Sequence, residues 1–382
     1  MSEQHDVVII GAGLVGLSTA YQLAQRGIRD VVVLERAQTH AQGSSGRSAG
    51  GVRLEFSHPS SIRFSQYGLQ VFDRFEEEFG ISPSFHACGY LFLTSDRARW
   101  EALLTVAGMQ RDCGVPVETL HAEAVRDRFS YVDLPALAGG LYGPRDGVGD
   151  PAAVAYGYIR RARDLGVEVR FGVTVTGIDT EAGRVTGVRT TAGRMDTPVI
   201  VNAAGPQARA IGLMAGIDIP VLPYRRSIYV TGPFDGLPAE MPMTLDLDTT
   251  SYLRREGRSI LIGMSDPDEP SSENVETDRD ALEKIVSTVL AWVPALETAA
   301  IMRGWAGLYE VSPDDSAIIG PVEELQGFYC ANGFSGHGFM HSPATGRVIS
   351  ELIAGEEPFI DIAPFRLSRF KDRAATPEQL VI

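Results

Sequence analysis

The chain has 382 residues, of which 44% are apolar and 22% charged, so it is long enough for two domains and has the composition of an ordered globular protein. Its formal net charge of -15 and its pI of about 5.0 argue against a nucleic-acid-binding surface and favour an enzyme. Because no run reaches the roughly 18 apolar residues that a membrane helix needs, we expect no membrane span.

The N-terminal sequence MSEQHDVVIIGAG enters an apolar strand without a basic segment before it, so we expect an unprocessed cytoplasmic protein. The residues that follow predict a βαβ unit. It consists of a buried parallel strand at Val7–Ile10, a helix at Leu14–Gln25 and a second strand at Val31–Leu34.

Gly11, Gly13 and Gly16 form a GxGxxG pattern between the first strand and the helix, and Glu35 ends the second strand. In this pattern the first glycine permits a tight turn, the second lets the backbone approach a pyrophosphate, and the third lets helix and strand pack closely. The phosphates meet the helix N-terminus, and the acidic residue can bind ribose hydroxyls. The unit therefore predicts an ADP-containing cofactor, which can be NAD or FAD.

A loop of small residues, AQTHAQGSSGRSAGGVRLEF, follows Glu35 and holds Arg47 and Arg53. Apolar periodicity then predicts helices at Ser61–Phe79, Arg97–Asp112, Ala152–Leu165, Asp278–Trp292 and Gly338–Ile353. Strands are predicted at Gly89–Thr94, Leu222–Thr231, Ser251–Arg255 and Ser259–Met264. Between 167 and 206 the chain alternates apolar and polar residues in strand fashion and ends in a second strand-to-glycine turn, VIVNAAG.

These elements predict an α/β fold (mixed α+β) with a discontinuous, Rossmann-like nucleotide-binding domain over residues 1–85, 145–215 and 312–382. Residues 86–144 and 216–311 are predicted to form a substrate-binding domain with a mainly antiparallel β-sheet.

The stretch NGFSGHGFMHSP holds two histidines, His337 and His341, whose spacing would suit a metal site on one helix face. It lacks the glutamate of HExxH, and no third ligand is evident, so we expect no metal. Small residues at a helix start also expose backbone N–H groups, which favour negative charge such as that of a reduced flavin. The three cysteines, Cys88, Cys113 and Cys330, lie far apart without CxxC and indicate neither disulfides nor a cysteine metal site.

The N-terminal GxGxxG, the distal VNAAG and the terminal GFSGHGF segment together resemble the FAD-dependent D-amino-acid oxidase superfamily over nearly the whole chain. GLYEVSPDDSAIIG followed by GFSGHGFMHSPATG is similar to the C-terminal flavin motif of monomeric sarcosine oxidase. RSIYVTG and WAGL are similar to segments of glycine oxidase and D-amino-acid dehydrogenases. The resemblance implies FAD, with its flavin ring between the two domains.

The resemblance also implies which residues contact FAD, from the pyrophosphate turn through the ribityl loop and the adenine strand to the segment under the pyrimidine end of the flavin. They are Gly11, Gly13, Leu14, Val15, Gly16, Glu35, Arg36, Ser44, Ser45, Arg47, Ser48, Ala49, Val175, Ala204, Gly205, Gly307, Gly336, His337, Gly338, Phe339 and Met340.

Three departures from the family pattern bear on the chemistry. Monomeric sarcosine oxidases attach their flavin through a cysteine where this chain has Gly307, so we predict non-covalent FAD. Their lysine that binds the substrate carboxylate is Met340 here, and the lysine associated with their oxygen reaction aligns with Leu261. The arginine that clamps primary amino acids in glycine oxidase is Tyr309, which favours a secondary amino acid.

Orienting an amino acid calls for an arginine fork on its carboxylate. Arg53 resembles the carboxylate arginine of sarcosine oxidase, and Arg226, with its neighbour Arg225, is the second candidate unless the pair forms an ion pair between domains. Tyr252 and Tyr309 are candidate pocket residues with core packing as the alternative. His337 can tune the flavin or move protons, or it can be held by backbone hydrogen bonds.

We therefore expect an FAD-dependent amine or amino-acid oxidoreductase. It would transfer a hydride from the carbon next to nitrogen to flavin N5, and water would hydrolyse the imine. A secondary amino acid such as sarcosine or proline is favoured as substrate, with oxygen or a redox partner as electron acceptor. Two alternatives stay open: a β-type subunit of a multi-subunit amino-acid dehydrogenase with a hetero-oligomeric partner, and a catalytically silent FAD-binding subunit or assembly factor.

Overall fold

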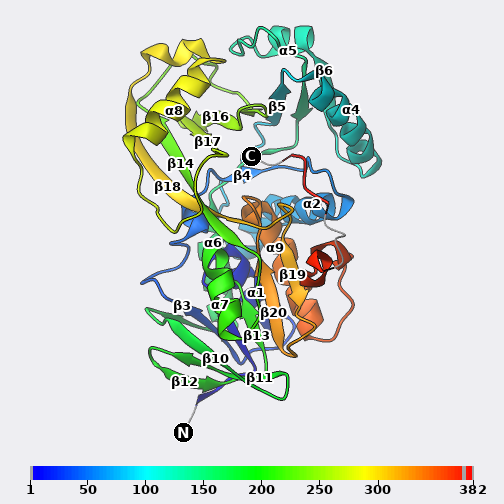
Figure 1. The fold of residues 1–382 in the computed structure, drawn as a ribbon, viewed down its shortest axis with the longest axis vertical. Helices are drawn as coiled ribbons and strands as arrows, with labels where there is room; N and C mark the ends of the chain where they lie inside the picture. Colours follow the sequence, from blue (N-terminus) through cyan, green and yellow to red (C-terminus); the bar gives the residue numbers. More distant parts are fainter. Residues whose placement is uncertain (1–2, 372–375, 381–382) are drawn as a thin grey trace.

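The computed structural model describes residues 3–371 and 376–380, and the chain folds into two parts that lie one above the other in Figure 1. The lower part contains the N-terminal βαβ unit, and the upper part contains a larger sheet with helices α4, α5 and α8 around it. The described C-terminal residues lie between the two parts. The junction of the two parts therefore involves residues from several distant segments of the chain.

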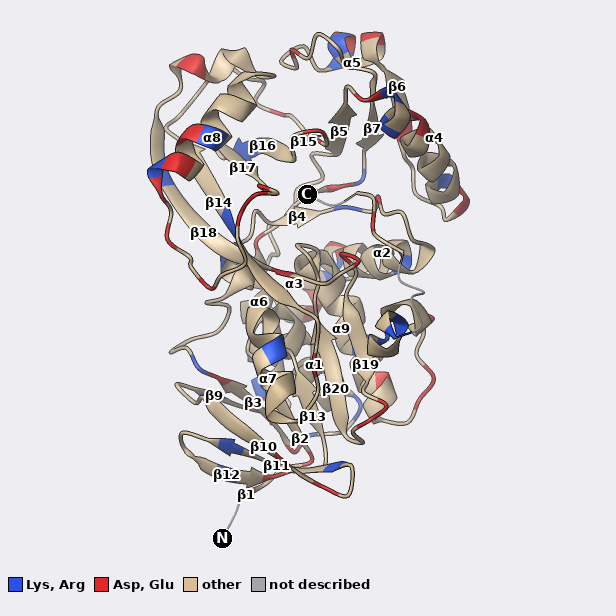
Figure 2. Cartoon of the chain, viewed as in Figure 1, with Lys and Arg blue, Asp and Glu red and all other residues tan. Residues whose placement is uncertain are grey.

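The lower part is built on a six-stranded sheet with the order β19-β20-β13-β2-β3-β9. Its strands are parallel except for the edge strand β19, which pairs antiparallel with β20. The strands are β2 (Val7–Ile10), β3 (Val31–Glu35), β9 (Glu168–Phe171), β13 (Ile200–Asn202), β19 (Ile318–Pro321) and β20 (Phe328–Asn332). In Figure 2 the central strands β2, β13 and β20 carry no charged residue, as expected for a sheet buried on both faces.

Helix α1 (Leu14–Gln25) packs against α9 (Gly338–Ile353) and α6 (Pro151–Asp164), which together cover the nucleotide sheet. The boundaries of α1 and α9 are those predicted from the sequence. A four-stranded sheet with the order β1-β12-β11-β10 lies beyond, with α7 (Ala208–Met214) packed on β10. Its strands are β1 (Glu3–Gln4), β10 (Val175–Glu181), β11 (Arg184–Thr190) and β12 (Gly193–Asp196).

The upper part is an eight-stranded sheet with the order β18-β14-β17-β16-β15-β5-β7-β6, antiparallel except between β5 and β15. This confirms the predicted mainly antiparallel second sheet. The strands are β5 (Tyr90–Thr94), β6 (Glu118–His121), β7 (Gly139–Gly143), β14 (Leu222–Thr231), β15 (Met243–Asp246), β16 (Ser251–Glu256), β17 (Ser259–Met264) and β18 (Ile301–Val311). The helices around it are α4 (Arg97–Asp112), α5 (Ala122–Arg128), α8 (Arg279–Leu290) and η3 (Pro294–Thr298).

Strand β18 connects the two parts. It pairs with β14 from Leu222↔Val311 to Thr231↔Ile301, and it also contacts the short helices η1 (Ser44–Arg47) and η2 (Gly205–Gln207) of the lower part. Strands β4 (Gly51–Val52) and β8 (Gly147–Val148) form a separate two-stranded sheet, and β4 contacts helix α9 of the lower part. The last two helical elements that the structure describes are η4 (Ala363–Phe365) and η5 (Leu367–Phe370).

One predicted helix, Ser61–Phe79, forms two helices instead: α2 (Pro59–Asp73) and α3 (Phe75–Phe79), with the break at Arg74. Within α3, Phe75 and Phe79 stack on each other with ring centroids 4.1 Å apart. Both rings also meet Tyr158 of α6 edge-on, so aromatic contacts hold α3 against α6 after the break.

The strands of the eight-stranded sheet all lie within residues 86–144 and 216–311, and the division into two domains remains our proposal. Across the described ranges, no helix is both long enough and apolar enough to cross a membrane.

Candidate active site

Three adjoining cavities, of about 540, 90 and 60 Å³, run from the nucleotide sheet to the eight-stranded sheet. Leu14, Ser44 and Glu310 line both the first and the second cavity. Tyr252 and Tyr309 line both the second and the third. The cavities therefore form one continuous site at the junction of the two parts.

The structure brings the residues singled out in the sequence to this site, with the exception of Gly16. The first cavity is lined by Gly11, Gly13, Leu14, Val15, Glu35, Arg36, Ser44, Ser45, Val175, Ala204 and Gly205. The second adds Arg47, Ser48, Ala49, Arg226, Tyr252, Gly307, Tyr309, Gly336, Gly338 and Phe339, and the third adds Arg53, His337 and Met340. Their individual roles stay predictions.

Two of the three glycines that follow β2, Gly11 and Gly16, have no room for a side chain. Gly11 has φ +112°, and a Cβ there would lie 2.4 Å from the carbonyl oxygen of Ala203. A Cβ on Gly16 would lie 2.0 Å from the oxygen of Gly11, so Gly16 acts through packing and does not line the cavity. A Cβ on Gly13 would have only the hydroxyl of Ser45 near it, at 3.2 Å, and would project toward the cavity. This arrangement fits a pyrophosphate against the backbone.

Glu35, at the end of β3, has a fixed carboxylate on the wall of the first cavity. Its Oε2 accepts the backbone N–H of Ala12 and its Oε1 accepts that of Ala37, each at 2.9 Å. A carboxylate oxygen accepts more than one hydrogen bond, so both oxygens remain able to receive ribose hydroxyls.

The loop that begins at Ser44 is tied to β18 by hydrogen bonds. The Ser44 hydroxyl donates to the carbonyl of Leu308 at 2.6 Å, and Arg47 Nη1 donates to the carbonyl of Ala306 at 2.8 Å. In return, the Trp305 indole donates to the carbonyl of Arg47 at 2.9 Å. Gly307 faces this loop, since a Cβ there would lie 3.0 Å from Arg47 Cβ. These hydrogen bonds connect a loop of the lower part to strand β18, so the wall of the second cavity contains residues from both parts of the molecule.

The start of α9 forms the opposite wall. Gly336 has φ +96°, and a Cβ there would lie 2.6 Å from the Tyr309 ring, so only glycine permits this contact. Pro343 lies inside the helix and has no N–H for the carbonyl of Phe339, four residues earlier. The Ser342 hydroxyl donates to that carbonyl instead, at 2.9 Å. The helix start is thereby held despite the proline.

Replacing Ser342 by alanine is expected to lower the free energy of unfolding by about 1 to 3 kcal/mol, because the buried Phe339 carbonyl loses its donor. Restoring an N–H in the S342A/P343A double variant should recover part of that loss. Denaturant unfolding of both variants checks this. An S342A stability equal to that of the wild type would show that the hydroxyl does not stabilise the helix start.

Arg53 is 2% exposed, and protein acceptors engage three of its five N–H groups. Nη1 donates to the carbonyl of Glu55, and Nη2 donates to the carbonyl of Leu380 and to His337 Nε2, the latter at 2.9 Å. The guanidinium also stacks over the Phe56 ring, 4.2 Å from its centroid. Arg53 lines the third cavity, but this bonding leaves it poorly placed to form a fork on a ligand carboxylate, the role the resemblance implied.

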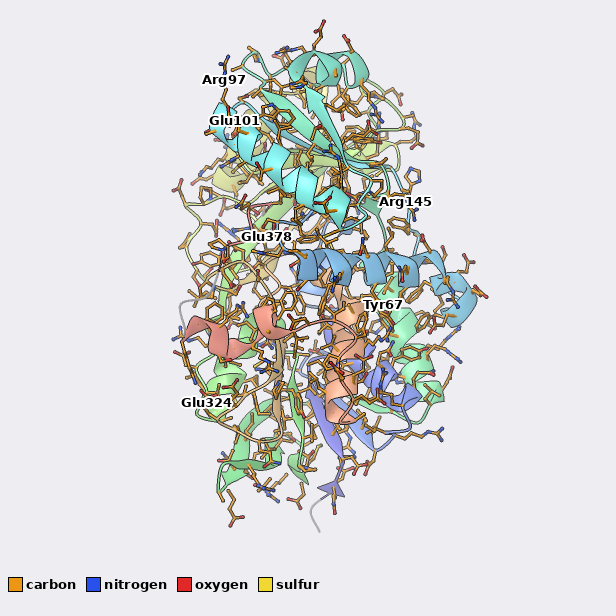
Figure 3. The ribbon with its side chains drawn as sticks, turned by 90° about the vertical axis from the view of Figure 1, so that its right-hand side faces the viewer. Tyr67, Arg97, Glu101, Arg145, Glu324 and Glu378 are labelled. Carbon is orange, nitrogen blue, oxygen red and sulfur yellow. The ribbon has the colours of Figure 1, made fainter. Side chains whose placement is uncertain are left out.

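Leu380 belongs to the C-terminal segment that docks beside α2. Glu378 Oε1 accepts the backbone N–H of Ser57 at 2.7 Å, and Figure 3 labels Glu378 close to α2, at the junction of the two parts.

His337 stays neutral, because burial and the charge of Arg53 hold its pKa well below the usual value. Its Nε2 therefore accepts from Arg53 and is not free to take a proton, which disfavours the predicted proton-transfer role. His341 is also neutral, since burial lowers its pKa to about 3, and its Nε2 meets the Ser65 hydroxyl at 3.0 Å.

Arg226 differs from Arg53 in its bonding. Its Nε is buried without a hydrogen-bond partner, and its Nη1 donates only to the carbonyl of Arg225, at 3.0 Å. Burial lowers the pKa of Arg226. Two acidic groups whose charge acts on Arg226 are engaged elsewhere: Glu269 with Arg225 at 2.8 Å and Asp266 with Lys284 at 2.6 Å. Among the described residues Arg226 forms no ion pair, so its guanidinium lines the second cavity without a bonded carboxylate.

Two tyrosines accompany Arg226. The Tyr309 ring centroid lies 5.4 Å from its guanidinium carbon, and Tyr252 lines the same cavity. Burial raises the pKa of both phenols, so both stay neutral, and neither hydroxyl has a hydrogen-bond partner in the described part of the chain. Arg225, in contrast, forms ion pairs with Glu269 and Asp278. Both partners lie within residues 216–311, as Arg225 does, so these pairs are not the ion pair between domains that the alternative described.

Sequence reasoning missed several residues that line the cavities, among them Tyr90, Met243 and Glu310. Tyr90 and Met243 line the third cavity from the starts of β5 and β15, where neither sits in a motif. Glu310 lines the first and second cavities. Strand alternation would put it on the face opposite Tyr309, so the period-two pattern carried no signal for it.

Metal-capable side chains gather elsewhere. Within the ranges that the structure describes, the group is Glu3, His5 and Glu168. Arg170 donates to Glu3 Oε2 at 2.7 Å and to Glu168 Oε1 at 2.6 Å, so a cation already joins the carboxylates. Neither lysine lines the three cavities, and each is paired with an acid, Lys284 with Asp266 and Lys371 with Glu324. Leu261 is fully buried in β17 and lines none of the three cavities.

Comparison with known proteins gives a family match over most of the chain. The family model described as FAD dependent oxidoreductase (DAO) matches residues 6–352. FAD-dependent oxidoreductase domain-containing protein 1 of Xenopus laevis is 30% identical, covering 100% of this chain and 85% of that protein. The mitochondrial dimethylglycine dehydrogenase of Rattus norvegicus is also 30% identical over 96% of this chain, which spans only 45% of that longer protein.

Among solved structures, the L-proline dehydrogenase from P. horikoshii aligns with a TM-score of 0.89 and 30% identity, covering 98% of this chain and 100% of that chain. Glycine oxidase from Geobacillus kaustophilus has a TM-score of 0.85 at 22% identity over 96% of this chain and 99% of that chain, and shares the fold.

Proposed function

Because the chain belongs to the FAD dependent oxidoreductase (DAO) family, we propose that it oxidises the C–N bond of a small secondary amino acid such as sarcosine or proline. The observation that carries the substrate class is Arg226, a guanidinium with a free buried Nε on the wall of the second cavity. Arg226 has no carboxylate partner among the described residues and lines the second cavity together with two neutral phenols, an arrangement that suits the carboxylate group of an amino acid.

The relatives support a secondary or tertiary amine next to that carboxylate. These relatives include an L-proline dehydrogenase, a dimethylglycine dehydrogenase and a sarcosine dehydrogenase. The small second and third cavities, of about 90 and 60 Å³, also favour a substrate with a short side chain. This chain spans less than half of the length of the dimethylglycine and sarcosine dehydrogenases. We therefore propose for this chain only the amine oxidation step that their names describe.

Bound FAD supplies a hydride acceptor for the substrate carbon next to nitrogen. Arg226 binds the substrate carboxylate, and the Tyr252 and Tyr309 hydroxyls donate hydrogen bonds to the carboxylate oxygens. These contacts hold the substrate in one orientation and so set the direction of its reacting C–H bond. As the hydride leaves, the nitrogen lone pair forms the C=N bond, and water hydrolyses the resulting imine. His337 is bonded to Arg53 and takes no proton in this scheme.

The backbone N–H groups at the start of α9 lie beside the second and third cavities through Gly336, Gly338 and Met340. A helix N-terminus there favours negative charge without a formal cation. We propose that these groups stabilise the electron-rich end of the reduced cofactor.

We propose that FAD is held without a covalent bond. Gly307 offers no thiol, and none of Cys88, Cys113 and Cys330 lines the three cavities. After precipitation of the holoprotein with acid, the flavin is expected in the supernatant. Yellow colour that stays with the washed pellet would contradict this prediction.

The reaction is tested by adding candidate substrates to the yellow holoprotein without oxygen. Sarcosine or proline should bleach the flavin, whereas glycine and D-amino acids with a primary amine should bleach it much more slowly. Readmitting air then separates an oxidase, which regains its colour at once, from a dehydrogenase, which regains it slowly. Bleaching by primary amino acids alone would contradict the proposed substrate class.

A further inference from the structure

Glu310 is a buried acid to which neither the substrate scheme nor the sequence analysis assigns a role. It follows Tyr309 in β18, and its Oε2 is buried without a hydrogen-bond partner among the described residues. Its position is held by the backbone, because its carbonyl accepts the N–H of Ser335 at 3.0 Å.

The carboxyl group of Glu310 lies where the first cavity joins the second, since it lines both. A Cβ on Gly205, in the second glycine turn, would be 3.5 Å from its Oε2. On its other side, the backbone N–H groups of Gly333 and Phe334 point at the carboxyl group. An extended dinucleotide that fills both cavities must pass this point with its pyrophosphate and the sugar chain attached to it.

We propose that Glu310 binds this linker of FAD as a neutral carboxylic acid, donating its proton in a hydrogen bond to an oxygen of the linker. A charged carboxylate beside a pyrophosphate would meet like charge in a buried site, which is costly. A protonated carboxyl group avoids that repulsion and supplies a donor where a phosphate or a hydroxyl oxygen can accept.

The surroundings keep the proton on Glu310. Burial raises its pKa to about 8, against the opposing effect of the two backbone N–H groups. No charged side chain is among the causes of that shift. The elements that face the two cavities do carry titratable or charged groups, which are Glu35, Arg36 and Glu273 on the first and Arg47, Arg226, Tyr252 and Tyr309 on the second.

The proposal predicts that FAD binds more weakly as Glu310 loses its proton. The sign follows from linkage, because FAD binds the protonated form and its binding therefore takes up a proton above the pKa. With a pKa of about 8, the apparent Kd should rise roughly tenfold between pH 7 and pH 9.

The test is a titration of the full-length apoprotein with FAD, followed by quenching of flavin fluorescence, from pH 6.5 to pH 9. The wild type should show the rise. Glu310→Gln, which keeps a neutral donor of the same shape, should bind FAD with a Kd that does not change with pH. Glu101→Gln removes an exposed carboxylate from α4, which lines none of the three cavities, and should behave like the wild type. A pH-independent wild-type Kd, or an equal rise in Glu310→Gln, overturns the proposal.

A second measurement needs only the wild type and so does not depend on the variant folding. Calorimetric titration with FAD at pH 9 in two buffers with different ionisation enthalpies gives the protons taken up per FAD, expected at about 0.9. Uptake near zero refutes the neutral-acid role. Both experiments measure FAD alone, so their outcome is separate from the identity of the amino-acid substrate.

Discussion

Replacing Arg226 by methionine is expected to raise the KM for the amino-acid substrate by roughly thirtyfold or more, because losing a buried charge-assisted pair costs about 2 to 5 kcal/mol. Methionine preserves much of the side-chain length but removes every donor. Since Arg226 has no carboxylate partner in the described protein, its loss leaves no protein acid unpaired and the fold should persist. The same variant should bind FAD and should oxidise an amine without a carboxylate as well as the wild type does.

Matched arginine variants separate the possible clamps. Arg226→Lys should recover part of the affinity, because a point charge replaces the fork. Arg53→Met should mainly lower thermal stability, since Arg53 joins Glu55, Leu380 and His337. Steady-state kinetics and thermal unfolding of the three variants distinguish these outcomes. A KM that changes with Arg53 but not with Arg226 would return the carboxylate role to Arg53.

Replacing Gly11 by alanine is expected to abolish most FAD binding and to lower the free energy of unfolding by about 2 to 4 kcal/mol. The new Cβ would lie 2.4 Å from the backbone oxygen of Ala203, which a flexible side chain cannot relieve, and the residue would keep φ +112°. The turns after β2 and β13 would have to separate, and both line the first cavity. The bound FAD per protein and the unfolding curve of the apoprotein measure the two effects.

Gly108 provides the control for this substitution. It lies within α4, and a Cβ there would meet no atom within 4 Å. Gly108→Ala should therefore stabilise the protein by about 0.5 to 1 kcal/mol and leave FAD content unchanged. If Gly11→Ala retained full FAD and wild-type stability, the glycine turn would not be the close contact described above.

Much of the fold follows from local sequence patterns. The helices at Leu14–Gln25 and Gly338–Ile353 begin and end where glycines and apolar periodicity predict, because their buried faces are continuous. Strand β18 (Ile301–Val311) was not predicted. It contains Gly304 and Gly307, which weaken a strand pattern, and they are needed because one packs on the Tyr229 ring and the other on Arg47.

The parts of the site that lie within sequence motifs were predictable. The glycine turns and the start of α9 line the cavities as the resemblance implied. The sequence could not tell whether Arg53 or Arg226 would bind the substrate carboxylate. The answer depends on which of the two guanidinium groups already donates its hydrogen bonds to acceptors within the protein. Arg53 is engaged by the carbonyl of Leu380, 327 residues away in the sequence, and no local pattern reports that contact.

The central claim is that bound FAD oxidises a small secondary amino acid whose carboxylate is held by Arg226. Its most direct test is anaerobic reduction of the flavin, followed by its visible absorbance, with proline and with pyrrolidine, the same amine without the carboxylate. We predict that wild-type protein is reduced much faster by proline than by pyrrolidine, and that Arg226→Met removes this difference. Equal rates for both amines in the wild type, or no reduction by any secondary amine, would contradict the claim.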